Sequence, residues 1–89
     1  MGNIVEFEVS KKELEALPKH ILEKLRRWAE QVELLGIMEV RKSKGWHDEP
    51  LKGQRKGQRS IRLNQAYRAI YIEDEKKVIV VKEANKHDY

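Results

Sequence analysis

Residues 59–82, RSIRLNQAYRAIYIEDEKKVIVVK, predict three consecutive strands joined by polar turns. In residues 59–63 apolar side chains alternate with polar ones, and a period of two is typical of a strand with one buried face. Residues 66–72 form a second predicted strand after a turn at Asn64–Gln65. Residues 77–82 are the most apolar of the three, and we expect this strand to lie centrally in the sheet.

The N-terminal part of the chain predicts one more strand and two helices. Apolar and acidic residues alternate in residues 5–9, as in a half-buried strand. Ser10 and Glu13 then have the spacing of a capping box, in which the serine hydroxyl accepts from the Glu13 amide while the glutamate reaches back. Pro18 ends this short helix and suits the first turn of a longer one, which Gly36 is expected to end. The longer helix carries one apolar stripe: Ile21, Leu25, Trp28, Val32 and Leu35.

These elements predict an α+β fold, a single domain over residues 1–89 with the element order β-α-α-β-β-β. The sheet is expected to be antiparallel, with the two N-terminal helices on one of its faces. Residues 37–57 lack periodicity and are interpreted as a long loop, of a length that is often functional. The other face of the sheet is where Arg62 and Arg68 could meet, if the strand register brings them together.

The composition excludes several kinds of chemistry. The 89 residues include no cysteine, which rules out disulfides, thiolate catalysis and cysteine-based zinc sites and fits a reducing cytoplasm. The first residues show no basic region followed by an apolar one, and no apolar run approaches the ~20 residues that cross a bilayer. We therefore expect a soluble, cytoplasmic protein with no membrane partner.

The net charge of +4 is concentrated in residues 41–68, which we call the basic segment. This segment has nine basic residues and two acids, whereas the rest of the chain has ten basic and thirteen acidic residues. A local excess of positive charge attracts polyanions such as RNA, although a solvated face that aids solubility would also account for it. The residues predicted to bind RNA are Arg41, Lys42, Lys44, Lys52, Arg55, Lys56 and Arg59.

A metal site is not expected from the sequence, and no cofactor is predicted. Nucleases that use metal ions need carboxylates that converge on the ion. Asp48 and Glu49 are adjacent, so on an extended chain their side chains point apart, while Asp74 and Glu75 belong to a polar hairpin turn. The histidines are scattered rather than spaced as a ligand pair: His20, His47 and His87.

RNA can be cut without a metal, because its 2′-hydroxyl is an internal nucleophile. The protein then needs cations for the crowded phosphate and groups that move protons to and from the reacting oxygens. Arginine grips two phosphate oxygens at once, and histidine exchanges protons near neutral pH. Lysine near other cations becomes a better acid, and tyrosine stacks on a base or joins the proton transfer. The predicted catalytic residues are Arg62, Arg68, Lys86, His87 and Tyr89. Each has a simpler alternative role, as a surface cation, a solvated tail residue or a C-terminal hydrophobic anchor.

Several runs of the sequence are also familiar in combination. HDEPLKG (47–53), GQRSIRL (57–63) and AYRAIY (66–71), with the ending NKHDY (85–89), resemble the RelE/HigB-type toxins. Each run is weak by itself, but the series is more specific, and the predicted element order matches as well. The resemblance therefore covers essentially the whole chain.

The resemblance implies the toxin of a type II toxin–antitoxin system, an endoribonuclease that cleaves mRNA in the ribosomal A site and so inhibits translation and growth. Attack by the 2′-oxygen would leave a 2′,3′-cyclic phosphate and a 5′-hydroxyl. Arg62 and Arg68 match the family's phosphate-holding and catalytic basic positions, and His87 and Tyr89 match its C-terminal base-stacking or proton-transfer positions. Ser60 stands where RelE-like members have a second lysine, which puts the chain nearer HigB and leaves the general base open.

The partners implied by the resemblance are the ribosome, mRNA and a cognate antitoxin, for example a helix-turn-helix protein of the HigA kind. The antitoxin could cover the basic segment or meet the toxin along its helices. Two alternatives remain open from the sequence. One is a ParE-like gyrase poison of the same fold, against which the basic and aromatic residues 86–89 argue. The other is a non-catalytic RNA-binding module that uses the basic segment for affinity alone.

Overall fold

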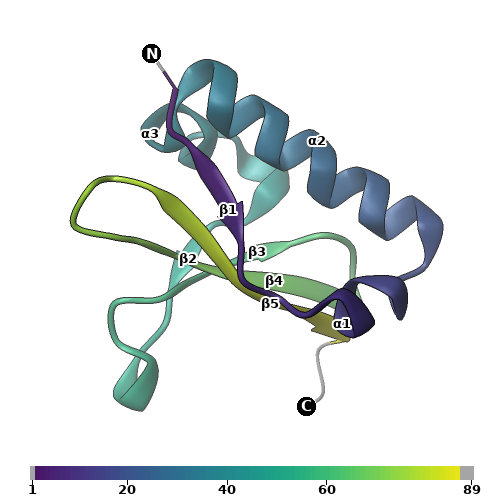
Figure 1. The fold of residues 1–89 in the computed structure, drawn as a ribbon. Coiled ribbons are helices and arrows are strands. Elements are labelled where there is room, and N and C mark those ends of the chain that lie inside the picture. Colours follow the sequence, from purple (N-terminus) through teal and green to yellow (C-terminus); the bar gives the residue numbers. More distant parts are fainter. Residues whose placement is uncertain (1, 87–89) are drawn as a thin grey trace.

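The computed structural model describes residues 2–86 of the chain. A long helix packs across one face of a twisted sheet, and shorter helices lie at the two ends of the long one (Figure 1). The helices are α1 (Lys11–Glu15), α2 (Lys19–Leu35) and α3 (Ile37–Arg41), with 3₁₀ turns η1 (Lys44–Trp46) and η2 (Gly53–Arg55). The strands are β1 (Val5–Phe7), β2 (Glu49–Pro50), β3 (Arg59–Arg62), β4 (Tyr67–Glu73) and β5 (Ile79–Lys86).

The strands form one sheet in the order β1-β5-β4-β3-β2. The pairs β2–β3, β3–β4 and β4–β5 are antiparallel, as expected for strands joined by turns. β1 pairs in parallel with β5, which differs from the antiparallel arrangement that the sequence predicts for the whole sheet. After β1 the chain crosses one face of the sheet through α2. The antiparallel strands β3, β4 and β5 then lead back to β1, and β5 runs in the same direction as β1. The α+β class and the predicted order of the main elements are confirmed.

The core lies between α2 and the sheet, as the apolar stripe of this helix predicts. Most of the stripe is buried: Ile21, Leu25, Trp28 and Val32. The Trp28 ring packs 5.2 Å from the Tyr71 ring of β4, at a tilt of 48°. Each such side chain contributes roughly 1.5–3 kcal/mol through burial. Within residues 2–86, no helix combines the length and the hydrophobicity needed to cross a membrane.

The C-terminal end of α2 departs from the prediction. Leu35 belongs to the predicted stripe but is 51% exposed. The helix ends there because Gly36 takes a φ of 88°, a left-handed value that favours glycine. The turn at Gly36 redirects the chain into α3, whose Ile37 and Val40 are buried in place of Leu35.

Residues 37–57, predicted as a long loop, contain α3, both 3₁₀ turns and β2. Trp46 anchors this segment, because it is buried and its Nε1 donates a hydrogen bond to Gln31 Oε1 of α2 at 3.1 Å. The Lys24 ammonium lies 5.9 Å from the centre of the Trp46 ring, on its face. These contacts with α2 help to hold the segment in place.

The capping box predicted at α1 forms only in part. Ser10 Oγ accepts from the Glu13 amide at 3.1 Å, as predicted. The Glu13 carboxylate makes its contacts elsewhere: Oε2 accepts from the Ala84 amide at 3.2 Å and Oε1 from Asn85 Nδ2 at 3.3 Å. Glu13 thus ties α1 to the C-terminal end of β5.

Candidate functional site

The strand register brings Arg62 and Arg68 together. Arg62 of β3 lies directly opposite Arg68 of β4, and Arg68 lies directly opposite Asn85 of β5. Directly paired residues share a face of the sheet, with Cβ atoms about 4.5–5.5 Å apart. We call Arg62, Arg68 and Asn85 the arginine row. The adjacent row, one residue along each strand, is buried on the face that α2 covers: Ile61, Ala69 and Ala84. The arginine row therefore lies on the opposite face.

The arginine row carries two positive charges on one face of the sheet. Both arginine side chains are half-buried, and neither forms an ion pair with a carboxylate of residues 2–86. Two like charges directly opposite each other on neighbouring strands repel. A phosphate between them would relieve that repulsion and accept hydrogen bonds from both guanidinium groups.

The other predicted catalytic residues are placed differently. Lys86 pairs with Tyr67, one position beyond Asn85, so its side chain alternates to the face opposite the arginine row. The register therefore does not bring Lys86 together with Arg62 and Arg68. His87 and Tyr89 lie outside the described residues, and their part in the site stays a prediction.

One carboxylate that the sequence analysis did not select lies on the same face as the arginine row. Glu49 of β2 pairs with Ser60 of β3, two residues before Arg62, which puts Glu49 diagonally across from Arg62. Such diagonal neighbours are about 7–8 Å apart. Glu49 is exposed, whereas the side chain of Asp48 is 1% exposed, so the two carboxylates point apart as predicted. The alternation of Asp48 and Glu49 could have indicated that Glu49 faces away from the core. Its position relative to Arg62 could be found only from the strand register.

Two arginines of the basic segment lie on the helix-covered face instead. Asp48 Oδ1 accepts from Arg59 Nε at 2.5 Å, and Oδ2 accepts from the Tyr71 hydroxyl. The same hydroxyl accepts from Arg41 Nε at 3.1 Å, and Arg41 also lies 3.8 Å from a carboxylate oxygen of Glu73. We call Arg41, Asp48, Arg59 and Tyr71 the helix-side network. It fastens the chain before β2 to α3 and to the middle of the sheet.

The environment of the helix-side network keeps its proton donors protonated. Burial, together with the hydrogen bond to Asp48, raises the pKa of Tyr71 above its ordinary value. Burial alone would lower the pKa of Arg59, but the hydrogen bond and charge of Asp48 outweigh it and raise that pKa. A neutral phenol and a charged guanidinium therefore both donate to the Asp48 carboxylate near neutral pH.

The remaining predicted RNA-binding residues divide into two groups. Lys42 pairs with Glu39 at 3.2 Å, and Arg55 pairs with Glu83 of β5 at 2.8 Å and donates to Gln58 at 3.1 Å. The others are exposed and form no ion pair with a carboxylate in the described part of the chain: Lys44, Lys52 and Lys56. Together with Arg62 and Arg68, these three lysines are the cations of the basic segment that have no ion-pair partner within residues 2–86.

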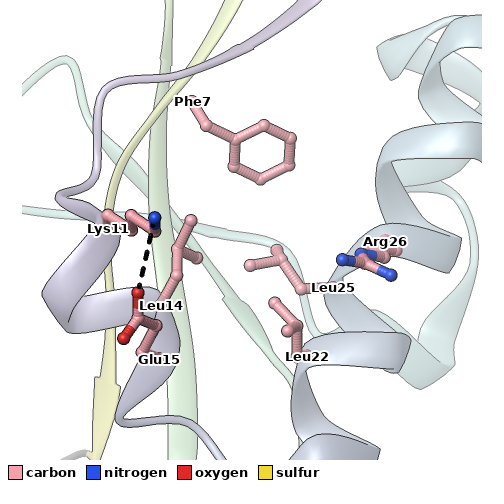
Figure 2. A pocket seen from close by; sticks show the side chains of 7 residues that line it. All are labelled: Phe7, Lys11, Leu14, Glu15, Leu22, Leu25 and Arg26. Carbon is pink, nitrogen blue, oxygen red and sulfur yellow. Dashed lines mark ion pairs between the residues drawn. The ribbon is translucent and has the colours of Figure 1, made fainter.

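An apolar groove of about 330 Å³ lies between α1, β1 and α2 (Figure 2). Its walls are formed mainly by Phe7, Leu14, Leu22 and Leu25. Charged side chains stand at its margins, including Arg26 and the ion pair between Lys11 and Glu15 at 4.0 Å. The groove lacks the paired cations of the arginine row and suits an apolar protein segment better than RNA.

In residues 2–86, no three side chains of histidine, aspartate or glutamate lie close enough together to hold a metal ion. This part of the chain therefore offers no candidate metal ligands for the site. The arrangement that remains is a pair of opposed arginines with Glu49 and Asn85 on the same face.

Comparison with solved structures identifies the fold. YafQ from Escherichia coli superposes with a TM-score of 0.75 at 16% identity, over 96% of this chain and 93% of that one. YoeB from Staphylococcus aureus, solved as a dimer, superposes with a TM-score of 0.69 at 18% identity, with all of both chains covered. A chain of the RelBE2 toxin–antitoxin complex from Mycobacterium tuberculosis superposes with a TM-score of 0.69 at 21% identity, over 98% of this chain and 100% of that one.

These similarities confirm the fold implied by the sequence resemblance. The chain has the fold of the RelE-, YoeB- and YafQ-type toxins of the RelE/ParE superfamily. The similar proteins include toxins solved in complex with their antitoxins, such as DinJ–YafQ from E. coli and YoeB–YefM from S. aureus. No protein-family model matches the chain, and no curated protein sequence matches it.

Proposed function

We propose that this protein is the toxin of a type II toxin–antitoxin pair and that it cuts mRNA on the ribosome in the cytoplasm, without a metal ion. The observation that carries the proposal is the pairing of Arg62 with Arg68, two cations directly opposed on one face of the sheet. Within residues 2–86, neither arginine has a carboxylate partner. This is the arrangement needed to stabilise the extra negative charge of a phosphate under attack.

The proposed reaction is an internal displacement at phosphorus. The 2′-oxygen of the nucleotide before the cut forms a bond to phosphorus, the bond from phosphorus to the 5′-oxygen breaks, and a 2′,3′-cyclic phosphate and a 5′-hydroxyl result. One proton leaves the 2′-hydroxyl and one is supplied to the 5′-oxygen. We assign the phosphate to Arg62 and Arg68, and proton transfer and base stacking to His87 and Tyr89.

Glu49 becomes a candidate general base by its place in the sheet. Its exposed carboxylate shares a face with Arg62 and is diagonal to it, so it can accept a proton from a 2′-hydroxyl whose phosphate the arginines hold. Lys86, which the sequence also suggested, points by its register to the other face. We therefore do not assign it a part in the chemistry.

Docking on ribosomal RNA is proposed for the exposed lysines of the basic segment. Lys44, Lys52 and Lys56 would contribute charge rather than specific contacts, so binding should weaken as salt rises. Arg41 and Arg59 are held in the helix-side network and would act on docking only by keeping the segment in place.

The chemistry can be tested with an mRNA that lacks one 2′-hydroxyl. The purified protein is incubated with ribosomes and mRNA, and the cut is mapped. A second mRNA carries a 2′-deoxynucleotide immediately before that cut. We expect cleavage at this position to disappear, with 2′,3′-cyclic phosphate and 5′-hydroxyl ends at the remaining cuts. Unchanged cleavage of the 2′-deoxy mRNA would contradict the mechanism, and intact mRNA with broken chromosomal DNA in arrested cells would favour a gyrase poison.

We further propose that the partner is a cognate antitoxin, of which a HigA-like helix-turn-helix protein is one kind, and that it meets the toxin along its helices. The groove of Figure 2 is apolar, and β1 beside it is an edge strand. Phe7 remains 42% exposed there. Phe7→Asp should weaken antitoxin binding at least about tenfold. Leu34→Asp, at a position 75% exposed outside the groove lining, is the control and should leave binding unchanged.

A further inference from the structure

The C-terminal half of β5 is held by α1 on the side that β1 leaves open. The pairing of β1 with β5 ends at Phe7 opposite Val81, and the amides of Glu8 and Val9 both donate to the Val81 carbonyl. Beyond Val81, the Glu13 carboxylate binds this edge of β5 in place of β1. It accepts the Ala84 amide at 3.2 Å and Asn85 Nδ2 at 3.3 Å. We call these two hydrogen bonds the Glu13 clasp.

The clasp acts on the residues that complete the arginine row. Asn85 lies directly opposite Arg68, and Ala84 lies opposite Ala69. From Lys86 the chain continues into His87 and Tyr89, to which the proposed function assigns proton transfer and stacking. A strand end bonded on only one side opens more readily than one bonded on both. The clasp supplies the second side, since β4 bonds one edge of this strand end and Glu13 bonds the other.

Charge makes Glu13 suited to this task. An ionised carboxylate accepts hydrogen bonds from N–H groups more strongly than a neutral acceptor does. Its helix is short, but Ser10 caps it through the backbone amide of Glu13, which leaves the Glu13 side chain available for β5. The side chain is half-buried, so its hydrogen bonds are partly shielded from water.

We propose that Glu13 is a positioning residue for mRNA cleavage. By holding Ala84 and Asn85, it sets the end of β5 beside Arg68, to which the proposed function assigns the phosphate. The inference rests on the proposed function, since positioning has a consequence only if the site cuts RNA. It predicts that loss of the clasp slows the cleavage step while docking on the ribosome, which depends on exposed lysines, is retained.

The test compares Glu13→Ala with Glu15→Ala. Glu15 is on the same helix, and its side chain is 66% exposed, with Lys11 at 4.0 Å as its ion-pair partner. Because a small displacement of reacting groups is costly, E13A should lower the single-turnover cleavage rate on saturating ribosomes by about 10- to 100-fold. Ribosome affinity should stay within about twofold. E15A should match the wild type in both measurements.

Two further readouts separate positioning from general destabilisation. Hydrogen exchange at the Ala84 amide should become faster in E13A and not in E15A. Glu13→Gln keeps an acceptor oxygen for the Ala84 amide, and Asn85 can turn its own carbonyl toward the new NH₂ group. E13Q should therefore recover the cleavage rate to within about threefold of the wild type.

The outcomes distinguish this inference from the proposed function. A wild-type protein that cleaves no ribosome-bound mRNA would overturn the proposed function and the inference with it. A wild type that cleaves, with an E13A variant that cleaves equally fast, would overturn the inference alone. So would an E13A variant that loses ribosome affinity in proportion to its rate, or an E15A variant that slows as much as E13A.

Discussion

The two faces of the sheet use the same residue type for opposite purposes. On the face covered by the helices, Arg59 is bonded to the buried Asp48 and belongs to a closed set of donors and acceptors. On the other face, Arg62 and Arg68 oppose each other, and neither has a carboxylate partner among residues 2–86. Arg59 and Arg62 are three positions apart in one strand, so alternation alone assigns them to different faces.

The difference separates stability from function within one basic segment. A buried carboxylate is tolerated only when donors satisfy it, and Arg59 and Tyr71 do so for Asp48. A pair of opposed cations adds nothing to stability and gains its favourable interaction when an anion arrives. Substitutions on the helix-covered face should therefore change folding, and substitutions in the arginine row should change cleavage.

The largest effect is expected when the helix-side network loses its centre. Asp48→Ala leaves Arg59 and the Tyr71 hydroxyl without their acceptor, and the free energy of unfolding should fall by about 3 kcal/mol. Chemical denaturation measures it. Glu49→Ala is the control at the next position, where the side chain is exposed, and should change stability by less than about 0.5 kcal/mol. Equal losses in the two variants would contradict the assignment of Asp48 to the network.

The complementary effect concerns the arginine row. Arg68→Ala should lower the cleavage rate on the ribosome by about 100-fold, because it removes charge that stabilises the transition state. Its free energy of unfolding should change by less than about 0.5 kcal/mol. Arg27→Ala, on the exposed surface of α2, removes the same charge and should leave the rate unchanged. An R68A variant that cleaves normally, or one that unfolds as readily as D48A, would remove the distinction between the faces.

The smallest effect is a pH dependence in the helix-side network. Tyr71→Phe removes one donor to Asp48 and should cost about 1–2 kcal/mol near neutral pH. The folded protein raises the pKa of Tyr71, so its contribution is present below the ordinary tyrosine pKa of about 10 and is lost as pH rises above it. The difference in unfolding free energy between wild type and Y71F should therefore narrow above about pH 10. A difference that grows with pH would contradict the assignment.

The convergence of Arg62 and Arg68 could be anticipated from the sequence only in part. Alternation put Arg62 on the face away from the core, but pairing with Arg68 depends on how the intervening turn closes. In the structure, Asn64 Oδ1 accepts from the amides of Ala66 and Tyr67 at 2.7 and 2.8 Å. The Leu63 amide donates to the Tyr67 carbonyl at 2.9 Å. This hydrogen bond closes the turn so that the next pair along the strands is Arg62 opposite Arg68.

Lys86 shows why the rest could not be predicted. The apolar run predicts a last strand over residues 77–82, whereas β5 extends to Lys86. The register also shifts between Ile70 and Tyr71, which breaks the simple alternation along β5. Without knowing where the strand ends and where its register shifts, one cannot tell from the sequence which face of the sheet a residue such as Lys86 occupies.

The local features of this protein follow from its sequence. Periodicity identified the long helix and the hairpin strands, and composition located the excess of positive charge. Alternation separates Arg59 from Arg62, but only the folded chain shows that Asp48 joins Arg59 and Tyr71 and that Glu13 holds the end of β5. Those contacts join residues between 11 and 72 positions apart. Strand register and helix docking determine such contacts, and both depend on the packing of the whole core rather than on any local pattern.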